Sequence, residues 1–96
     1  MDVLIAIDAP NLLNEKAFIK HLKKEGLEYL KEEEGMVFSG KSSTPVMNTR
    51  AFILEVVKRA LEKSPAKFCN MVCVIGENEM ESYGFDLKTM EFKELK

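Results

Sequence analysis

The fold is decided by residues 3–10, which read Val-Leu-Ile-Ala-Ile-Asp-Ala-Pro. Five apolar residues follow one another without a polar residue between them, and such a run is typical of a strand that is covered on both faces. Pro10 cannot donate a hydrogen bond to a sheet ladder, so the strand is predicted to end at Asp8. Ligand sites in open α/β sheets usually lie at the carboxyl ends of central strands, which makes Asp8 the first candidate site residue.

Two helices are predicted further along the chain. Asn14 is a favourable N-cap for the first helix, which is expected to end near Glu25. The second helix is expected from about Met47 to Lys63, because its apolar residues recur at helical spacing. Asn48 or Thr49 is the expected cap at its start.

Residues 27–34 allow two interpretations. They either form a strand that turns at residues 32–35 into a second strand, Met36 to Gly40, or they extend the first helix through Gly26. Their apolar and polar residues do not alternate cleanly, so the pattern alone leaves both interpretations open. We favour the hairpin of two strands.

Three further strands are predicted, at Phe68 to Ile75, at Glu79 to Leu87, and at the edge of the sheet from Met90 to Leu95. The resulting order is β-α-β-β-α-β with one or two strands appended. This order predicts an α+β fold of the ferredoxin-like type, a two-layer sandwich with two helices on one face of an antiparallel sheet. If residues 27–34 are helical, the order becomes β-α-β-α-β-β, which is still a two-layer sandwich.

The length and composition fit one compact domain, residues 1–96. The chain has 96 residues, of which 46% are hydrophobic and 31% charged, and this length is too short for two domains. No stretch approaches the roughly 18 apolar residues of a membrane span. Asp2 stands where a signal peptide would carry basic residues. These features predict a cytoplasmic protein that does not enter a membrane.

Cys69 and Cys73 lie in the apolar run of a predicted strand. Residues four apart in a strand share a face but are separated by about 13 Å, at roughly 3.3 Å per residue. This separation is too long for a disulfide or a shared metal ion. The two cysteines are therefore predicted to be buried thiols in a reducing compartment.

The formal net charge of -2 argues against a broad contact with duplex nucleic acid. Lys16, Lys20, Lys23 and Lys24 nevertheless make one side of the first helix basic. A solvated helix face is the simplest interpretation, and a local contact with RNA or with an acidic protein is the alternative. Nucleic acid is kept as a partner that the overall charge does not favour.

Residues 35–42, Gly-Met-Val-Phe-Ser-Gly-Lys-Ser, match the letters of the P-loop pattern. The chemistry of that motif requires a strand before the first glycine and a helix that begins at the lysine. Here the strand-like residues lie inside the motif, and Pro45 interrupts any helix that begins at Lys41. A phosphate-binding loop is therefore not expected.

Asp8 and Asn11 are the candidate metal ligands, because carboxylate and amide oxygens bind hard cations such as Mg²⁺ and Mn²⁺. These two residues do not complete a site. Glu77, Glu79 or Glu81 would have to approach, or a second subunit would have to contribute its own Asp8 across a two-fold axis. The alternative interpretation is that Asp8 caps the following turn by accepting backbone N–H bonds.

The remaining residues offer no recognisable catalytic constellation. His21 is the only histidine, and no serine, cysteine or acid lies at an interpretable spacing from it, so it is predicted to be a surface residue. Met71, Met80 and Met90 fall among the C-terminal strands. Flexible methionine side chains suit cores and adaptable interfaces alike, which makes a homodimer through these strands the alternative to plain core packing.

The run that ends at Asp8, the helix after it and the stretch Met36-Val37-Phe38-Ser39-Gly40 together resemble the small CRISPR-associated adaptation nuclease subunit and the VapD-type ribonucleases. The resemblance covers about half of the chain. It implies a ferredoxin-like fold, dimers built through C-terminal strands, and metal-dependent phosphodiester cleavage at the dimer interface with Asp8 as a ligand. No arginine follows Asp8, so Asp8 alone carries over from the pattern.

These observations lead to two expectations about function. The first is a non-enzymatic interaction or regulatory module of unknown partner that forms a homodimer and binds no cofactor, with a protein or, less favoured by the charge, a nucleic acid as the candidate partner. The alternative is a metal-dependent endoribonuclease that uses Mg²⁺ or Mn²⁺ and Asp8 at a dimer interface.

Overall fold

The computed structural model describes residues 1–31, 35–86 and 88–95 and consists of two helices and a six-stranded sheet. The sheet has the order β2-β3-β1-β4-β5-β6, and every neighbouring pair of strands is antiparallel. The elements in chain order are β1 (Asp2–Asp8), α1 (Glu15–Lys24), β2 (Glu28–Lys31), β3 (Met36–Lys41), α2 (Val46–Lys63), β4 (Asn70–Ile75), β5 (Glu81–Asp86) and β6 (Glu91–Glu94).

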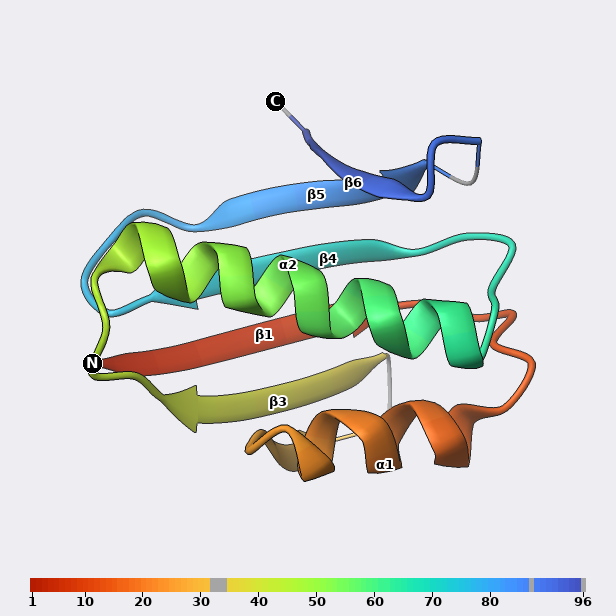
Figure 1. Ribbon diagram of the computed structural model, residues 1–96, viewed down its shortest axis with the longest axis horizontal. Coiled ribbons are helices and arrows are strands. Elements are labelled where there is room, and N and C mark those ends of the chain that lie inside the picture. The colour runs from red at the N-terminus through yellow and green to blue at the C-terminus, as the bar shows by residue number, and fades with distance from the viewer. Residues whose placement is uncertain (32–34, 87, 96) are drawn as a thin grey trace.

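Both helices cover the same face of the sheet (Figure 1). β3 lies between β1 and β2, and β1 lies between β3 and β4, so each helix connects two strands that are separated by a third. The predicted α+β class and the two-layer sandwich are confirmed.

The segment after α1 is a strand. Residues 28–31 form β2, which pairs with β3 through Glu28 opposite Ser39 and Tyr29 opposite Phe38. The rings of Tyr29 and Phe38 pack with centroids 5.1 Å apart, which anchors this edge strand on the core. The hairpin interpretation is confirmed for residues 28–31 and the helical alternative is wrong there. Residues 32–34 of the predicted turn lie outside the described residues.

Helix α1 begins as the sequence predicts. The Asn14 side chain accepts a hydrogen bond from the backbone N–H of Ala17 at 3.0 Å, as an N-cap does. The helix buries Phe18 and Leu22 against the sheet and ends at Lys24, one residue before the predicted end.

Helix α2 begins at Val46, with Pro45 in the N-cap position and no side-chain cap. The predicted cap at Asn48 or Thr49 is wrong, because both residues lie inside the first helical turns. The Thr49 hydroxyl is instead hydrogen-bonded to Ser42 at 2.6 Å and to Thr44 at 2.9 Å, which fastens the incoming loop to the helix.

Strand β1 is buried on one face only. Val3, Ile5 and Ile7 point into the core, whereas the residues between them are exposed. The prediction that this strand is covered on both faces is wrong, because both helices pack on the same side of the sheet. The core side also includes Phe18, Phe38, Leu22, Ile53, Leu61, Met71 and Ile75, which are almost completely buried.

Strands β4, β5 and β6 follow in the predicted order and are somewhat shorter than predicted, and Leu87 lies outside the described residues. Cys69 and Cys73 are buried and free, as predicted. Burial raises the pKa of Cys69 to about 12 and that of Cys73 to about 11, so both thiols stay protonated at neutral pH. Among the described residues, neither helix is long and apolar enough to cross a membrane.

Candidate interaction surfaces

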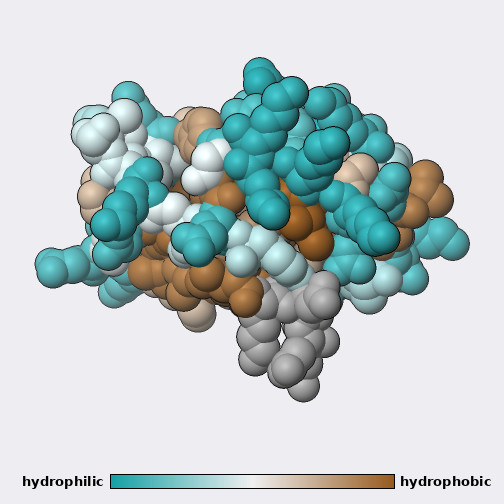
Figure 2. Space-filling view, turned by 90° about the horizontal axis from the view of Figure 1, so that it is seen from below, coloured by the Kyte–Doolittle hydropathy of each residue, from teal (hydrophilic) through white to brown (hydrophobic). Residues whose placement is uncertain are grey.

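The side of the sheet without helices has an apolar centre. We call it the outer face. In β1, Leu4 and Ala6 point to this face, where the sheet register places them beside Val37 of β3 and Val72 and Val74 of β4. Leu4 is 47% exposed, which is high for a leucine in a central strand. In Figure 2 the outer face forms the lower side of the molecule, where hydrophobic side chains gather away from the helices.

The outer face is hollowed near the start of β1. A depression of about 740 Å³ lies there, with Leu4 and Val74 among the residues that line it. Asp2, Glu28 and Lys41 also line the depression, so its apolar residues are bordered by charged ones. The depression is therefore open and mixed in character, unlike an enclosed apolar ligand site.

Charged side chains of both signs border the outer face. Asp2 and Asp8 are exposed at the two ends of β1, and Glu28 is exposed on β2. On β5 and β6, Asp86 is paired with Lys93 at 3.0 Å. Lys41 is the exposed base beside Asp2 in the sheet register.

Asp8 ends β1 as predicted and is exposed beside Asn70 of β4. Asn11 is exposed in the turn that follows. Among the described residues, no hydrogen bond joins the Asp8 carboxylate to a backbone N–H of this turn, so the interpretation of Asp8 as a turn cap gains no support. The metal-ligand interpretation remains a prediction.

The glutamates that were to approach Asp8 lie elsewhere. Ile75 pairs with Val3, so Glu77 and Glu79, which follow β4, are at the opposite end of β1 from Asp8. Glu81 instead accepts hydrogen bonds from Arg50 and Tyr83. Within the part of the chain that the structure describes, no three His, Cys, Asp or Glu side chains gather as metal ligands.

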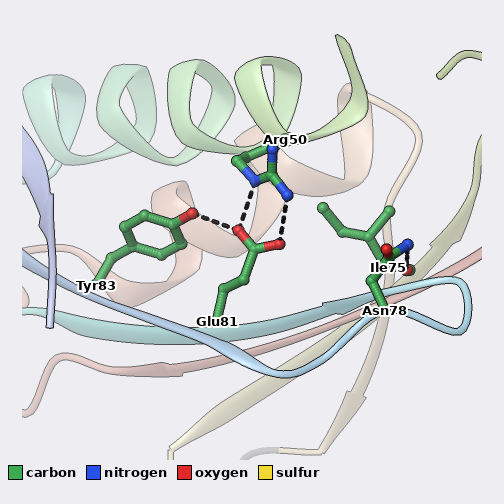
Figure 3. Close-up of polar contacts among 5 residues, drawn as sticks. All are labelled: Arg50, Ile75, Asn78, Glu81 and Tyr83. Carbon is green, nitrogen blue, oxygen red and sulfur yellow. Dashed lines mark hydrogen bonds and ion pairs between the residues drawn. The ribbon is translucent and has the colours of Figure 1, made fainter. Parts of the chain in front are cut away.

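A polar cluster joins α2 to β5 on the helix side of the sheet (Figure 3). Arg50 donates two hydrogen bonds to Glu81, from Nε at 2.6 Å and from Nη2 at 2.8 Å, and the Tyr83 hydroxyl donates to the same carboxylate. Side-chain exposure is 37% for Arg50 and 12% for Glu81. A bidentate pair of this kind is among the stronger side-chain interactions in proteins.

The electrostatics of this cluster fix its charge state. The hydrogen bonds from Arg50 lower the pKa of Glu81 despite partial burial. Burial and the neighbouring Glu81 raise the pKa of Tyr83 well above its usual value. At neutral pH the cluster is therefore one cation, one anion and one neutral phenol, and no member of it is poised to exchange a proton. The arrangement is that of a structural ion pair that joins α2 to β5.

The sequence did not reveal this cluster. Arg50 and Glu81 are 31 residues apart, and Glu81 was considered as a metal ligand instead. Only the register of β5 beside β4, which places Glu81 opposite Cys73 on the helix side, brings the two together.

His21 lies on α1 at the surface, as predicted, but is partly buried where α1 approaches Lys63 of α2. Its Nδ1 atom lies 3.5 Å from the Lys63 amino group. Its buried Nε2 atom has no hydrogen-bond partner among the described residues. Burial and the positive charge of Lys63 lower the pKa of His21, which keeps the ring neutral at pH 7.

The P-loop letters in residues 35–42 do not form a P-loop. Gly35 precedes β3 with a φ of 120°, and a Cβ atom there would meet the carbonyl oxygen of Ile7 at 2.8 Å, so the glycine is explained by close packing. Lys41 ends β3, and helix α2 begins only at Val46. The expectation from the sequence is confirmed.

The last candidate surface is the free edge of β6. The Leu95 N–H donates to the Ser82 carbonyl at 2.8 Å, which makes these residues a hydrogen-bonded pair of the β5–β6 ladder. Such pairs alternate along antiparallel strands, so Glu91 and Lys93 also turn their backbone groups toward β5. The backbone groups of Phe92 and Glu94 then point outward, where the described sheet has no further strand.

Comparison with known proteins provides no identification. No protein-family model, no curated protein and no solved structure matches the chain.

Proposed function

We propose that this protein is a non-enzymatic interaction module that forms a homodimer by pairing β6 with the β6 strand of a second copy. The observation that supports the proposal most strongly is the free, self-complementary edge of β6. Outward backbone groups on Phe92 and Glu94 offer donors and acceptors to a new strand. Two-fold symmetry is the commonest arrangement of soluble dimers.

The register of such a pair follows from the two-fold axis. An antiparallel pair centred on Phe92 places Phe92 opposite its copy, because both residues direct their backbone groups outward. Glu91 then faces Lys93 of the partner subunit, and Lys93 faces Glu91 of the partner subunit. Opposite charges across neighbouring strands contribute about 0.2–1 kcal/mol for each pair. Slipping the register by one residue would remove both charge pairs and misalign the hydrogen bonds.

A proline substitution tests the pairing. Phe92→Pro removes the outward N–H at the centre of the pair while leaving the bonds to β5 in place, and an edge strand tolerates proline in this orientation. We expect a dimer of 10.9 kDa chains for the wild type and for Phe92→Ala, which loses the ring but keeps the N–H, and a folded monomer for Phe92→Pro, measured by analytical ultracentrifugation with circular dichroism as the check on folding. A wild type that stays monomeric at about 100 µM, or a Phe92→Pro variant that stays dimeric, would refute the β6 pairing.

A charge exchange supplies the second test. Glu91→Lys places two like charges across the dimer and should raise the dissociation constant, by up to roughly ten-fold for each repelling pair. Adding Lys93→Glu restores both opposite-charge pairs, and Asp86 keeps a lysine within reach at position 91, which it faces in the sheet. Recovery of the dimer in the double variant is the expected result.

The alternative, a metal-dependent endoribonuclease, makes a different geometric demand. It needs two Asp8 carboxylates around one cavity. In a β6–β6 dimer, three strand spacings in each copy and one between the copies separate the two β1 strands, which at ~4.8 Å per spacing is about 34 Å. The two proposals therefore exclude each other. Mn²⁺ binding by calorimetry and RNA cleavage that are both lost in Asp8→Asn would establish the nuclease instead.

A further inference from the structure

The exposed flank of α1 carries positive charge that its surroundings do not compensate. The lysines on it are Lys16, Lys20, Lys23 and Lys24, all of them exposed. Within the described chain, none of them takes part in an ion pair. Helix α2 differs, because Glu55 there pairs with Arg59 one turn away at 3.0 Å. A chain with a formal net charge of -2 thus gathers unpaired cations on one helix.

The arrangement of these lysines is unfavourable for the helix itself. The charged residues three or four positions from Lys20 are Lys16, Lys23 and Lys24. Like charges at these spacings repel and destabilise a helix. Lys23 and Lys24 are favourable in the last turn, where the helix dipole is negative. Lys16 lies in the first turn, where the dipole opposes a positive charge, so helix stability explains neither Lys16 nor Lys20.

The lysines border a shallow depression of about 240 Å³. Its lining residues are Lys16, Ile19, Lys20 and Lys23. Ile19 is partly buried and packs against the core, which gives the depression a fixed apolar contact. Glu15 and Glu25 lie at the two ends of the helix and do not line the depression. We call this surface the lysine flank, and the charged side chains that line it have one sign.

The size and composition of the lysine flank distinguish between anionic partners. From Lys16 to Lys23 it is about 10 Å long at 1.5 Å per residue, which is the scale of a contact with one helix. Among the described residues that line it, none is aromatic, so bases have no stacking partner, and the net charge of -2 disfavours a long nucleic acid. A lipid surface would require more apolar surface than Ile19 provides. An acidic helix satisfies both the charge and the length.

We propose that the lysine flank binds an acidic helix of another protein. Glutamates at positions i, i+4 and i+7 of that helix match the spacing of Lys16, Lys20 and Lys23, and an apolar residue between them would lie on Ile19. This inference rests on the proposed role as an interaction module and names the partner. It does not depend on the β6 dimer, because α1 contacts β2, at the opposite edge of the sheet from β6 (Figure 1).

A designed peptide serves as the probe. It is a fluorescein-labelled helix of alanine, leucine and glutamate, about 18 residues long so that it is helical alone, and its control carries glutamine in place of every glutamate. Binding is measured by fluorescence anisotropy on the wild type and on Phe92→Pro. We expect saturable binding of the glutamate peptide with the same dissociation constant for both proteins, at least ten-fold weaker binding when salt is raised from about 50 to about 300 mM, and no binding of the glutamine peptide.

Two double variants locate the site. Lys16→Gln with Lys20→Gln removes two charges and keeps a similar helix propensity, so it should weaken binding at least ten-fold. Its Tm should be no lower than that of the wild type, because repulsion within α1 is relieved. The matched control is Lys41→Gln with Lys88→Gln, which removes the same charge at exposed positions on β3 and in the turn before β6 and should leave binding within two-fold of the wild type.

Other outcomes would overturn the proposal. Equal weakening in the two double variants would show a general attraction to the chain. A lower Tm for the variant of Lys16 and Lys20 would assign these lysines to the stability of α1. Tighter binding of a short oligouridine or of phosphatidylserine vesicles than of the glutamate peptide would replace the protein partner by RNA or by a membrane. A wild-type dimer without peptide binding would refute the lysine flank alone, whereas a monomer that binds the peptide would refute the β6 pairing alone.

Discussion

Glu81 is a carboxylate on the helix side of the sheet, and its burial has an energetic cost unless its oxygens are hydrogen-bonded. Arg50 and Tyr83 supply those bonds. Cys73, which lies opposite Glu81 on β4, could offer only a thiol, which is a weak hydrogen-bond donor. The cluster also joins the first half of α2 to β5. The cluster therefore stabilises the contact between the first half of α2 and β5.

Replacing Glu81 should reveal that contribution. Glu81→Ala leaves Arg50 and the Tyr83 hydroxyl without their shared acceptor and should lower the free energy of unfolding by about 1–3 kcal/mol. Glu55→Ala removes the exposed ion pair in which Arg59 Nε lies 3.0 Å from Glu55 Oε1. It should lower the free energy of unfolding by less than about 0.5 kcal/mol. Urea denaturation of both variants makes the comparison. Equal losses would show that the Arg50 cluster is no more than a surface ion pair.

The lowered pKa of His21 predicts a loss of stability in mild acid. The unfolded chain takes up a proton on this residue near pH 6.5, whereas the folded protein does so only at lower pH, because burial and Lys63 oppose the charge. The contribution is complete above pH 6.5 and declines as the pH falls below it. Unfolding free energies at about pH 7.5 and 5.5 should differ less in His21→Gln than in the wild type. An unchanged difference would assign the acid sensitivity to other groups.

At the scale of elements, the buried Ser64 joins the end of one helix to the start of the other. Its side chain is 0% exposed. The hydroxyl donates to the Asn14 carbonyl at 2.6 Å and accepts from the Asn14 N–H at 2.9 Å. Asn14 in turn caps α1, so this serine sets the position from which that helix starts.

Removing this hydroxyl should loosen both helix ends. Ser64→Ala removes both bonds between the hydroxyl and the Asn14 backbone, whose carbonyl still accepts from the Phe18 N–H at 3.1 Å, and should destabilise the fold by about 1–2 kcal/mol. Ser43→Ala, at an exposed position in the loop before α2, is the matched control and should stay within about 0.5 kcal/mol of the wild type. Hydrogen exchange provides the local readout, since protection in the first turn of α1 should fall in Ser64→Ala. Unaltered protection there would argue against the link.

The elements themselves were predictable because their signals are local. The Asn14 cap and the helical spacing of Ile53, Val57 and Leu61 act within one or two turns, and both helices appear where they were expected. The cap of α2 was predicted wrongly because Thr49 bonds to the preceding loop from inside the helix, a contact that cap preferences do not encode. The burial of β1 was misjudged because an apolar run does not distinguish a face that is covered in the chain from one that is exposed.

For the whole molecule, the class and the layers followed from the order of elements, while the candidate surfaces did not. The outer face lies opposite α1 and α2, which share one side of the sheet as the order of elements predicted, but its exposed apolar centre was not expected because β1 was interpreted as covered on both faces. The Arg50 cluster and the separation of Glu77 and Glu79 from Asp8 depend on how β4 and β5 align with β1. Strand alignment is a property of long-range packing, so these sites were not accessible from spacing along the chain.

The central position of β1 has a consequence for how the protein reaches its native state. This strand pairs with β3, which follows within the first half of the chain, and with β4, which begins only at Asn70. Closing the second of these pairings requires a long loop to form first, and topologies with many distant contacts fold slowly, typically in milliseconds to seconds. Until β4 arrives, one edge of β1 is unpaired, and this nascent edge is the segment of the chain most exposed to misassembly.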